Sequence, residues 1–292
     1  MERKMAYPIK KPQAFFFAEL SNTPKHLLTF KTSDTLRLFL RGRNSLIAIT
    51  LLFTSINIRA DWYVIDNYKG SIGPYQIHIS LQKYDDYGSG QNIRGSYYYD
   101  KHLASIPLYG RYSSSSIELC EIHNNREYET YLNLGRNDGF NMHSCSFKLT
   151  KNGDDLVGVW QGEKKSYEVL LKHTSSFDSE RKQKITTEKI EIPFWGQTPA
   201  HGFIGIYQED ENGAYINKVN IIDKTTGEIV QTFNPQLHGC DFGFFMTTIY
   251  QNIESKKERS QVRLNCYSTK SDVFSDYRYD SENHRYLFID NQ

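Results

Sequence analysis

Alternation of apolar and polar residues dominates the chain from residue 61 onward. In YQIHISLQ, residues 75–82, every second residue is apolar and the residues between are polar. This period of two places one face of an extended strand on a core. Turn-forming segments such as DDYGSG, SSSS and KNGD separate further runs of this kind. The runs are QNIRGSYYYD, ASIPLYGRY, SSIELCEI, EYETYLNL, SCSFKLT, DLVGVWQG and SYEVLLKH. They predict an antiparallel meander over 61–173 that closes into a barrel or packs as a sandwich.

The segment TSSFDSERKQK, residues 174–184, is polar and charged, shows neither the strand period of two nor a helical period, and is expected to be a linker. A second set of strands is expected after it. The second set comprises KITTEKIEI, HGFIGIYQ, AYINKVNIID, GEIVQTF, FGFFMTTIYQ, QVRLNCYS and a closing pair around DSENH. These runs predict a second small β domain over 185–292. Gly227 is expected to supply a positive φ in one hairpin.

The composition supports an all-β protein. The 21 tyrosines and 17 phenylalanines favour pleated, half-buried positions. The chain shows no helix of convincing length beyond residue 60. Glycines within or at the ends of the predicted strands, at 95, 110, 158 and 162, are expected where neighbouring backbones approach closely.

The segment 37–60 has the order of a secretory signal peptide. Arg37, Arg41 and Arg43 precede an apolar run of about a dozen residues, and a small residue, Ala60, ends it. A transmembrane helix needs roughly 20 apolar residues, and a buried core helix would have no helical partner. We therefore expect export to the periplasm with cleavage after Ala60. Residues 1–36 are expected to be a start assigned too far upstream or a cytoplasmic extension.

Removal of the leader changes the charge. The first 60 residues hold ten of the 35 basic and three of the 34 acidic residues, which leaves 25 basic against 31 acidic residues, a net charge of −6. This balance argues against nucleic acid, whose binders carry a basic surface. It suits a cationic partner, because opposite net charge speeds encounter.

All four cysteines follow the leader, at 120, 145, 240 and 266. Four cysteines allow three pairings. The sequence gaps favour 120–145 and 240–266, one disulfide in each half, as befits an oxidising compartment. No CxxC or Cys/His spacing indicates zinc.

Candidate chemistry is sparse. The chain has no GxSxG, HExxH or phosphate-binding glycine loop, and no cofactor is expected. Glu118 and Glu121 resemble a glycosidase pair, but residues three apart on a strand point to opposite faces. His201 and His238 flank apparent loops and are expected to be solvated.

Two features are candidate partner contacts. The acidic cluster Glu209, Asp210 and Glu211 precedes Asn-Gly at an expected hairpin tip. Its alternatives are a plain solvated turn and part of a cation site. The run of three tyrosines at 97–99 must show both faces of a strand, and Tyr98 is the member expected to contact a partner.

The order of segments resembles a known group of proteins. The first half, with IRGSYYY, IPLYGR, IELCE and LVGVW, resembles a β-rich domain of exported bacterial proteins. The second, from YINKVNIIDKTTGEIVQTF through CDFGFFMTTIYQ to YRYDSENHRYLFID, resembles FG-GAP/VCBS-like domains. The combination is similar to periplasmic immunity proteins that inhibit peptidoglycan-hydrolysing effectors. In such second domains a D-x-N-x-D-G segment binds calcium. Here only Asp241 is retained of that pattern, so no bound calcium is expected.

The resemblance, the acidic charge and the lack of a catalytic motif favour a non-enzymatic binding protein that occludes a lysozyme-like cell-wall hydrolase. An inserted loop or aromatic tip would block the cleft while carboxylates steer the basic partner. A carbohydrate- or surface-binding module that uses exposed tyrosines is the alternative. An enzyme with an unrecognised carboxylate pair is a third.

Overall fold

The protein is all-β, as the sequence predicts. The computed structural model describes residues 63–84, 90–123, 145–178, 189–210, 213–240, 246–256, 260–266 and 273–289. These residues form sixteen strands and two 3-10 helices, and they belong to one compact unit, Arg59–Gln292. The predicted leader, the strand predicted over 127–134 and the linker residues 179–184 lie outside the described ranges. None of the described helices is long and apolar enough to cross a membrane.

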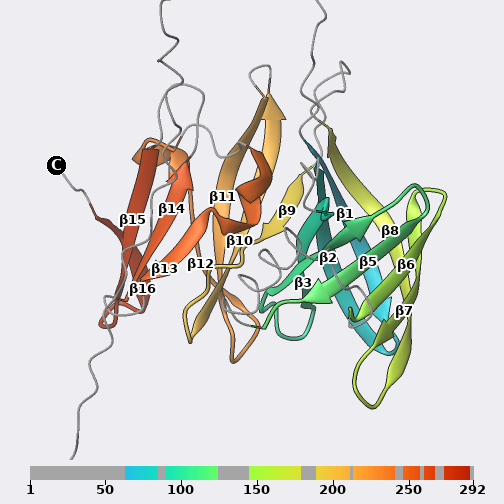
Figure 1. Cartoon of the computed structure of the whole chain (residues 1–292). Helices are drawn as coiled ribbons and strands as arrows, with labels where there is room; N and C mark the ends of the chain where they lie inside the picture. The colour runs from blue at the N-terminus through green and yellow to red at the C-terminus, as the bar shows by residue number, and fades with distance from the viewer. Residues whose placement is uncertain are drawn as a thin grey trace, which may run out of the picture. The chain divides into compact units, whose positions relative to one another are not determined.

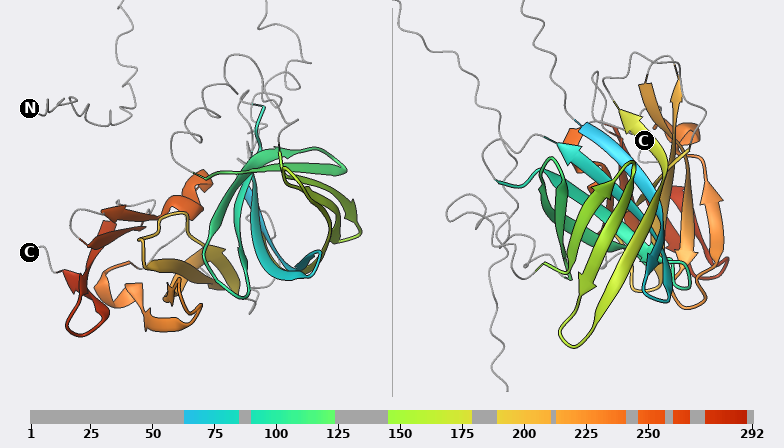
Figure 2. Two further views of the ribbon diagram at one scale, coloured as in Figure 1. Left: turned by 90° about the horizontal axis from the view of Figure 1, so that it is seen from below. Right: turned by 90° about the vertical axis from the view of Figure 1, so that its right-hand side faces the viewer.

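Eight antiparallel strands of the first half close into a barrel (Figures 1 and 2). Each strand pairs with the next in sequence, and β1 pairs with β8 from Val64↔Asp178 to Ile72↔Val169. Of the two predicted arrangements, the barrel is therefore the one found. The strands are β1 (Tyr63–Ile72), β2 (Tyr75–Tyr84), β3 (Ile93–Tyr99), β4 (Ile106–Tyr112), β5 (Ser116–Glu121), β6 (Phe147–Asn152), β7 (Asp155–Gln161) and β8 (Ser166–Asp178).

Side chains fill the barrel interior, because every second residue of each strand points inward. The middle is apolar, with Ile77, Ile79, Leu108, Leu119 and Leu149 among its buried side chains. The four predicted close-approach glycines are confirmed. An added Cβ would lie 1.9–2.2 Å from a backbone oxygen at 95, 110 and 158, and 2.6 Å from the Trp160 ring at 162.

One end of the barrel is closed by charged groups. Asp66 accepts a hydrogen bond from Lys83 Nζ at 2.6 Å and one from the Ser176 hydroxyl at 2.8 Å. His173 Nε2 lies 3.5 Å from the same carboxylate. Burial by itself raises the pKa of Asp66, but the charge and hydrogen bond of Lys83 outweigh it and lower the pKa.

Two four-stranded antiparallel sheets make up the second half. One has the order β12-β11-β10-β9 and the other β13-β14-β15-β16. Gly227 has a positive φ of 74° in the turn between β11 and β12, as predicted. The strands are β9 (Ile190–Pro193), β10 (His201–Asp210), β11 (Gly213–Asp223), β12 (Ile229–Phe233), β13 (Ile253–Lys256), β14 (Gln261–Cys266), β15 (Val273–Asp280) and β16 (Arg285–Ile289).

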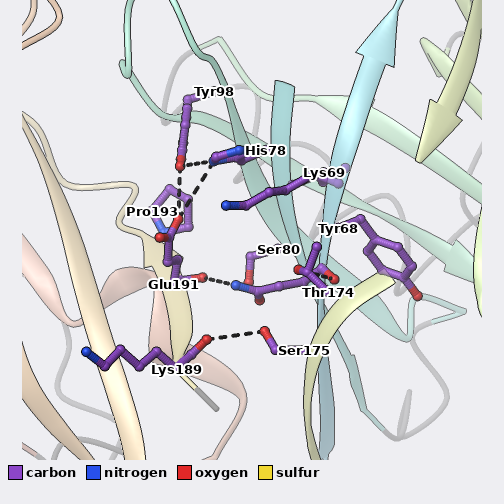
Figure 3. Close-up of a pocket in the computed structure, with 12 residues that line it drawn as sticks. Tyr68, Lys69, His78, Ser80, Tyr98, Thr174, Ser175, Lys189, Glu191 and Pro193 are labelled. Atoms are coloured by element: carbon purple, nitrogen blue, oxygen red, sulfur yellow. Dashed lines mark hydrogen bonds and ion pairs between the residues drawn. The ribbon is translucent and has the colours of Figure 1, made fainter. Parts of the chain in front are cut away.

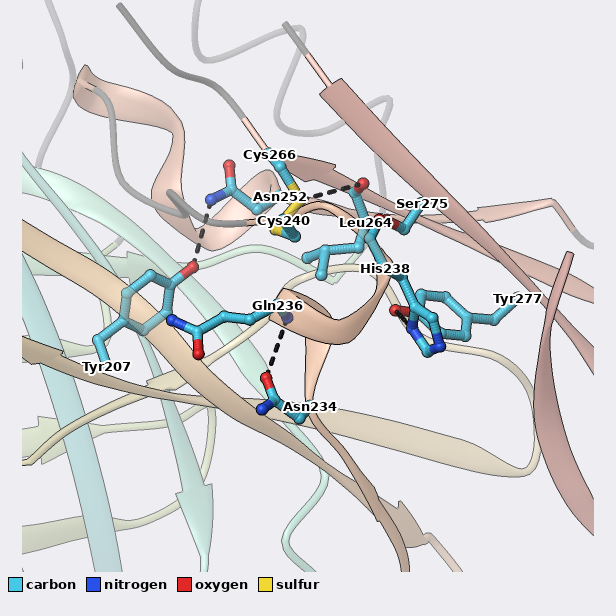
Figure 4. The surroundings of a disulfide bond; sticks show 10 residues. All are labelled: Tyr207, Asn234, Gln236, His238, Cys240, Asn252, Leu264, Cys266, Ser275 and Tyr277. Carbon is cyan, nitrogen blue, oxygen red and sulfur yellow. Dashed lines mark hydrogen bonds between the residues drawn. A yellow bond between two sulfur atoms is a disulfide. The ribbon is translucent and has the colours of Figure 1, made fainter. Parts of the chain in front are cut away.

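The two predicted disulfides are present. Cys120 is bonded to Cys145, with Cα atoms 4.1 Å apart, and Cys240 to Cys266, with Cα atoms 5.4 Å apart. Figure 4 shows the second bond beside the 3-10 helix η4 (Pro235–His238). The side chain of Asn234 caps this helix by accepting from Gln236 N at 2.9 Å. Disulfides of this kind are typical of an oxidising, extracellular-type environment.

The outer face of β1, β2 and β3 is polar yet buried. Ser80, Gln82 and Ser96 are all less than 2% exposed. The Ser80 hydroxyl lies 2.9 Å from the Tyr250 hydroxyl, and Trp195 Nε1 donates to the Gly95 carbonyl at 2.8 Å. The two halves of the chain therefore share a hydrogen-bonded surface.

A side chain joins the edges of the two small sheets. The Gln231 amide on β12 donates to Tyr286 O at 2.9 Å, and its oxygen accepts from Tyr286 N at 2.7 Å. Tyr286 lies on β16, the edge strand of the other sheet. The amide thus pairs with both the N–H and the C=O of one residue on that edge, as a neighbouring antiparallel strand would.

Two segments differ from expectation. FGFFMTTIYQ is predicted as a strand, but its described part is the 3-10 helix η5 (Met246–Gln251). Ile249 and Tyr250 are consecutive and both buried, which fits a helical turn and not an alternating strand. In addition, β8 continues to Asp178, five residues into the predicted linker. Its extra length is paired with β1 and contributes Phe177 to the core of the second half.

The Asp66–Lys83 pair makes stability depend on pH. Replacing Asp66 with Asn leaves the Lys83 charge unpaired inside the barrel, and we expect a loss of about 3 kcal/mol of unfolding free energy at pH 7. Because the folded pKa of Asp66 is lowered, the contribution is complete above the ordinary value of 3.8 and disappears as pH falls through the folded value. Urea unfolding at pH 7 and across the acid range measures both.

The matched control is Asp154→Asn, at an exposed aspartate in the β6–β7 turn. It is expected to change the unfolding free energy by less than about 0.5 kcal/mol. Equal stability of the Asp66 variant and the wild type at pH 7 would show that the pair contributes nothing.

Candidate functional site

Four partly exposed aromatic side chains surround the other end of the barrel. We call Tyr75, Tyr99, Trp160 and Tyr167 the aromatic cup. They come from β2, β3, β7 and β8, each at or near the end of its strand. In an antiparallel meander every second turn lies at the same end, so these inward positions converge there. The hollow between them and the adjoining turn measures about 380 Å³.

The rings of the cup hold one another at defined angles. The Tyr75 ring meets those of Tyr99 and Tyr167 edge-on, with centroids 6.0 and 5.9 Å apart. The Trp160 and Tyr167 rings are stacked, with centroids 6.1 Å apart and planes inclined by 27°. Tyr75 is 50% exposed, so part of its ring faces solvent. Such mutual packing fixes the rings before any ligand arrives.

A carboxylate beneath the cup orients its tryptophan. Glu121, the last residue of β5, accepts from Trp160 Nε1 at 2.9 Å and from the Ser146 hydroxyl at 3.1 Å. The Tyr97 hydroxyl also donates to it. The Cys120–Cys145 disulfide joins the residues just before Glu121 and Ser146, and therefore holds both partners at this end of the barrel.

The rim of the cup carries charge. The turn from Gly162 to Lys165 closes through a hydrogen bond from Gly162 N to Lys165 O at 2.9 Å. It exposes Glu163, Lys164 and Lys165 beside the hollow. Any side chain at Gly162 would collide with the Trp160 ring. The cup thus combines aromatic ring faces with a polar border that carries both negatively and positively charged side chains.

Tyr98 lies elsewhere. It points outward from β3, opposite to its neighbours Tyr97 and Tyr99, and is only 3% exposed. Its hydroxyl donates to Glu191 Oε2 at 3.0 Å and contacts His78 Nδ1 (Figure 3). Burial raises the pKa of Tyr98, with the Glu191 charge as the next cause. Its predicted contact with a partner stays a prediction, and Tyr98 is one of the residues that line the cleft of Figure 3.

Glu209 and Asp210 of the acidic cluster lie at the end of a hairpin, as expected. β10 and β11 pair to their ends, at Glu209↔Ala214 and Asp210↔Gly213. Glu211 lies outside the described residues, as does the Asp241 segment with its incomplete calcium pattern. Within the described ranges no three His, Cys, Asp or Glu side chains gather as a metal site.

Other candidates from the sequence prove structural. Glu118 pairs across the sheet with Arg111 and Lys148, while Glu121 points inside, so the two carboxylates do face opposite sides. The expectation of a solvated His201 is wrong. It is 6% exposed, because it packs against the rings of Tyr279 and Tyr286.

Sequence reasoning did not find the cup. The alternation places Tyr75 on the apolar face of its strand, but its three partners in the cup lie 24 to 92 residues further along the chain. The sequence indicates the cup through the position of its four rings, since each occupies an inward position at the same end of the meander. Recognising it requires knowing that the meander closes.

Removing the carboxylate of Glu121 should loosen the cup. Glutamine at 121 offers one acceptor oxygen to three donors and adds an N–H₂ group among them. We expect Glu121→Gln to lower the unfolding free energy by about 2 kcal/mol and to shift Trp160 fluorescence. Glu118→Gln, on the outer face of the same strand, should cost less than about 0.5 kcal/mol. Identical effects of the two changes would contradict the role assigned to Glu121.

Comparison with known proteins identifies no relative: no protein-family model matches the chain, and no curated protein or solved structure is significantly similar. The residues of the cup, their geometry and their charged border are therefore the basis for inferring function.

Proposed function

We propose that the protein is an exported binding protein that takes a saccharide in the aromatic cup. The observation that carries this proposal is the hollow of about 380 Å³ surrounded by four aromatic side chains from four strands. Sugar rings present flat C–H faces that stack on aromatic rings, and hydroxyls that need polar partners. The cup offers ring faces, and its border offers Glu163 and Lys164 for the hydroxyls.

The filled interior limits the kind of ligand. Buried Ile72, Tyr97 and Phe147 occupy the barrel below the cup. A ligand therefore lies across the mouth and does not enter the barrel. This suits one or two units of a polymer, such as a cell-wall or surface glycan, better than an apolar molecule that needs full enclosure. The two disulfides support a location outside the cytoplasm, with Asp61 as the expected mature N-terminus.

Titration with soluble glycans tests the cup. Chitooligosaccharides, cellooligosaccharides and solubilised peptidoglycan fragments are added while tryptophan fluorescence is followed, since Trp160 lines the hollow. We expect saturable binding of at least one glycan. Tyr75→Ala and Tyr167→Ala should each weaken it about fivefold, corresponding to ~1 kcal/mol for a lost aromatic contact.

Leu170→Ala provides the control, because Leu170 is 48% exposed on the outside of β8, the strand that carries Tyr167. Its affinity should equal that of the wild type. Absence of binding to all three glycan types, or equal affinity in the tyrosine variants, would rule out the cup as a saccharide site.

A second candidate function is inhibition of a lysozyme-like cell-wall hydrolase, as an immunity partner. It is supported by the sequence resemblance and by the position of Glu209 and Asp210 at the end of the β10–β11 hairpin. A projecting acidic tip suits the basic rim of a hydrolase cleft, and charges at a rim act mainly on the association rate.

An inhibition assay with a lysozyme-like hydrolase and peptidoglycan tests this function. Combining Glu209→Gln, Asp210→Asn and Glu211→Gln should slow association about tenfold at low salt, with a smaller effect at high salt because of screening. Glu228→Gln, at the exposed β11–β12 turn, is the control. An association rate of the triple variant equal to that of the wild type at low salt would remove the acidic tip from the mechanism.

A further inference from the structure

A polar cleft lies on the outside of the barrel, away from the aromatic cup. It is bounded by the outer faces of β1, β2 and β3, by β8 and by β9, and it encloses about 180 Å³ (Figure 3). The side chains that matter here are Asn67, Lys69, Thr174, Ser175 and Glu191. The volume suits a ligand of a few heavy atoms, much smaller than a glycan.

A β-bulge shapes one wall of the cleft. Asn67 is paired with Ser175 but Tyr68 with His173, so Thr174 is an extra residue in β8. In a regular strand consecutive side chains point to opposite faces, whereas a bulge brings two to one side. Thr174 and Ser175 accordingly both line the cleft. The Thr174 hydroxyl donates to Asn67 O at 3.0 Å, so its oxygen still presents an acceptor.

Asn67 supplies a buried acceptor. Its side-chain Nδ2 donates to Glu191 O at 2.9 Å, which fixes the orientation of the amide. The opposite atom, Oδ1, is buried and has no hydrogen-bond partner among the described residues, and Asn67 as a whole is 8% exposed. A buried acceptor without a partner is costly, so a ligand that brings an N–H donor gains at this point.

Opposite charges complete the site. The Glu191 carboxylate accepts from the Tyr98 hydroxyl at 3.0 Å, and His78 Nδ1 lies 3.8 Å from it. Figure 3 shows the Lys69 ammonium extending over the cleft toward Glu191, while that of Lys189 points away. Glu191 from β9 and Lys69 from β1 therefore bring opposite charges to the same cleft, beside the acceptors of Asn67 and Thr174.

We propose that this cleft binds a small zwitterion of amino-acid size, with its ammonium group on Asn67 Oδ1 and Glu191 and its carboxylate on Lys69. The inference stands apart from the saccharide proposal, because the two sites share no lining residue. Both charged ends are required. An anion alone meets the Glu191 carboxylate, and a cation alone meets the Lys69 ammonium.

Calorimetric titration of the mature protein with glycine, L-alanine and D-alanine tests the site, with acetate and ethylammonium as half-ligands. We expect saturable binding of at least one zwitterion, and binding of each half-ligand at least about tenfold weaker. Glu191→Gln keeps an acceptor for Tyr98 but removes the charge, and Lys69→Met removes the cation. Each should weaken zwitterion binding about tenfold, the effect of losing one charge-assisted hydrogen bond.

Two controls separate this result from others. Lys189→Met removes a lysine whose ammonium points away and should leave zwitterion affinity unchanged. Tyr75→Ala alters only the aromatic cup and should also leave it unchanged. Circular dichroism confirms that each variant is folded. No saturable binding of any zwitterion, equal binding of a half-ligand, or unchanged affinity in both Glu191→Gln and Lys69→Met would each overturn the proposal.

Discussion

Burial of a polar face on the barrel is the constraint on which this structure depends. A closed barrel usually exposes its outer positions to water, but here β1, β2 and β3 place serines, glutamine and asparagine under the second half. Buried polar groups must be hydrogen-bonded or they destabilise the fold. The second half provides partners such as Tyr250, Trp195 and the backbone of Glu191. Hydrogen bonds are directional, so pairing these groups fixes one arrangement of the two halves, whereas apolar contact alone would allow several.

The same constraint explains where binding sites can lie. The barrel interior is occupied by aliphatic side chains in the middle and by the Asp66 cluster at one end. The two sites proposed above lie at the remaining end and in the covered outer face. The aromatic cup is the first of these places. The cleft beside Thr174 is the second: the bulge brings Thr174 and Ser175 to one side, and Asn67 Oδ1 has no hydrogen-bond partner among the described residues.

Local sequence rules predicted the strands and the disulfides well. Period-two alternation is enforced by the backbone, so runs such as 75–82 identify themselves, and similar loop lengths indicated both cysteine pairs. The predictions that failed concern residues whose environment is set by contacts distant in sequence. Ser80 and Gln82 look like solvent-facing positions and are buried only because another part of the chain covers them. FGFFMTTIYQ is apolar without alternation, and such runs do not distinguish a strand from a helical turn. A run of three tyrosines likewise does not reveal which members point into the barrel, and only the folded meander places Tyr97 and Tyr99 on its inner side.

The bond between Gln231 and Tyr286 has a consequence for self-association. The outermost strand of an open sheet presents unpaired peptide groups, to which a strand from another molecule can add. Barrel closure leaves β1 and β8 paired with each other, and the Gln231 amide occupies both the N–H and the C=O of Tyr286 on β16. A single side chain thus satisfies the outward-facing backbone groups of one residue on an open edge. An incoming strand would have to displace this amide before it could pair with the edge at Tyr286.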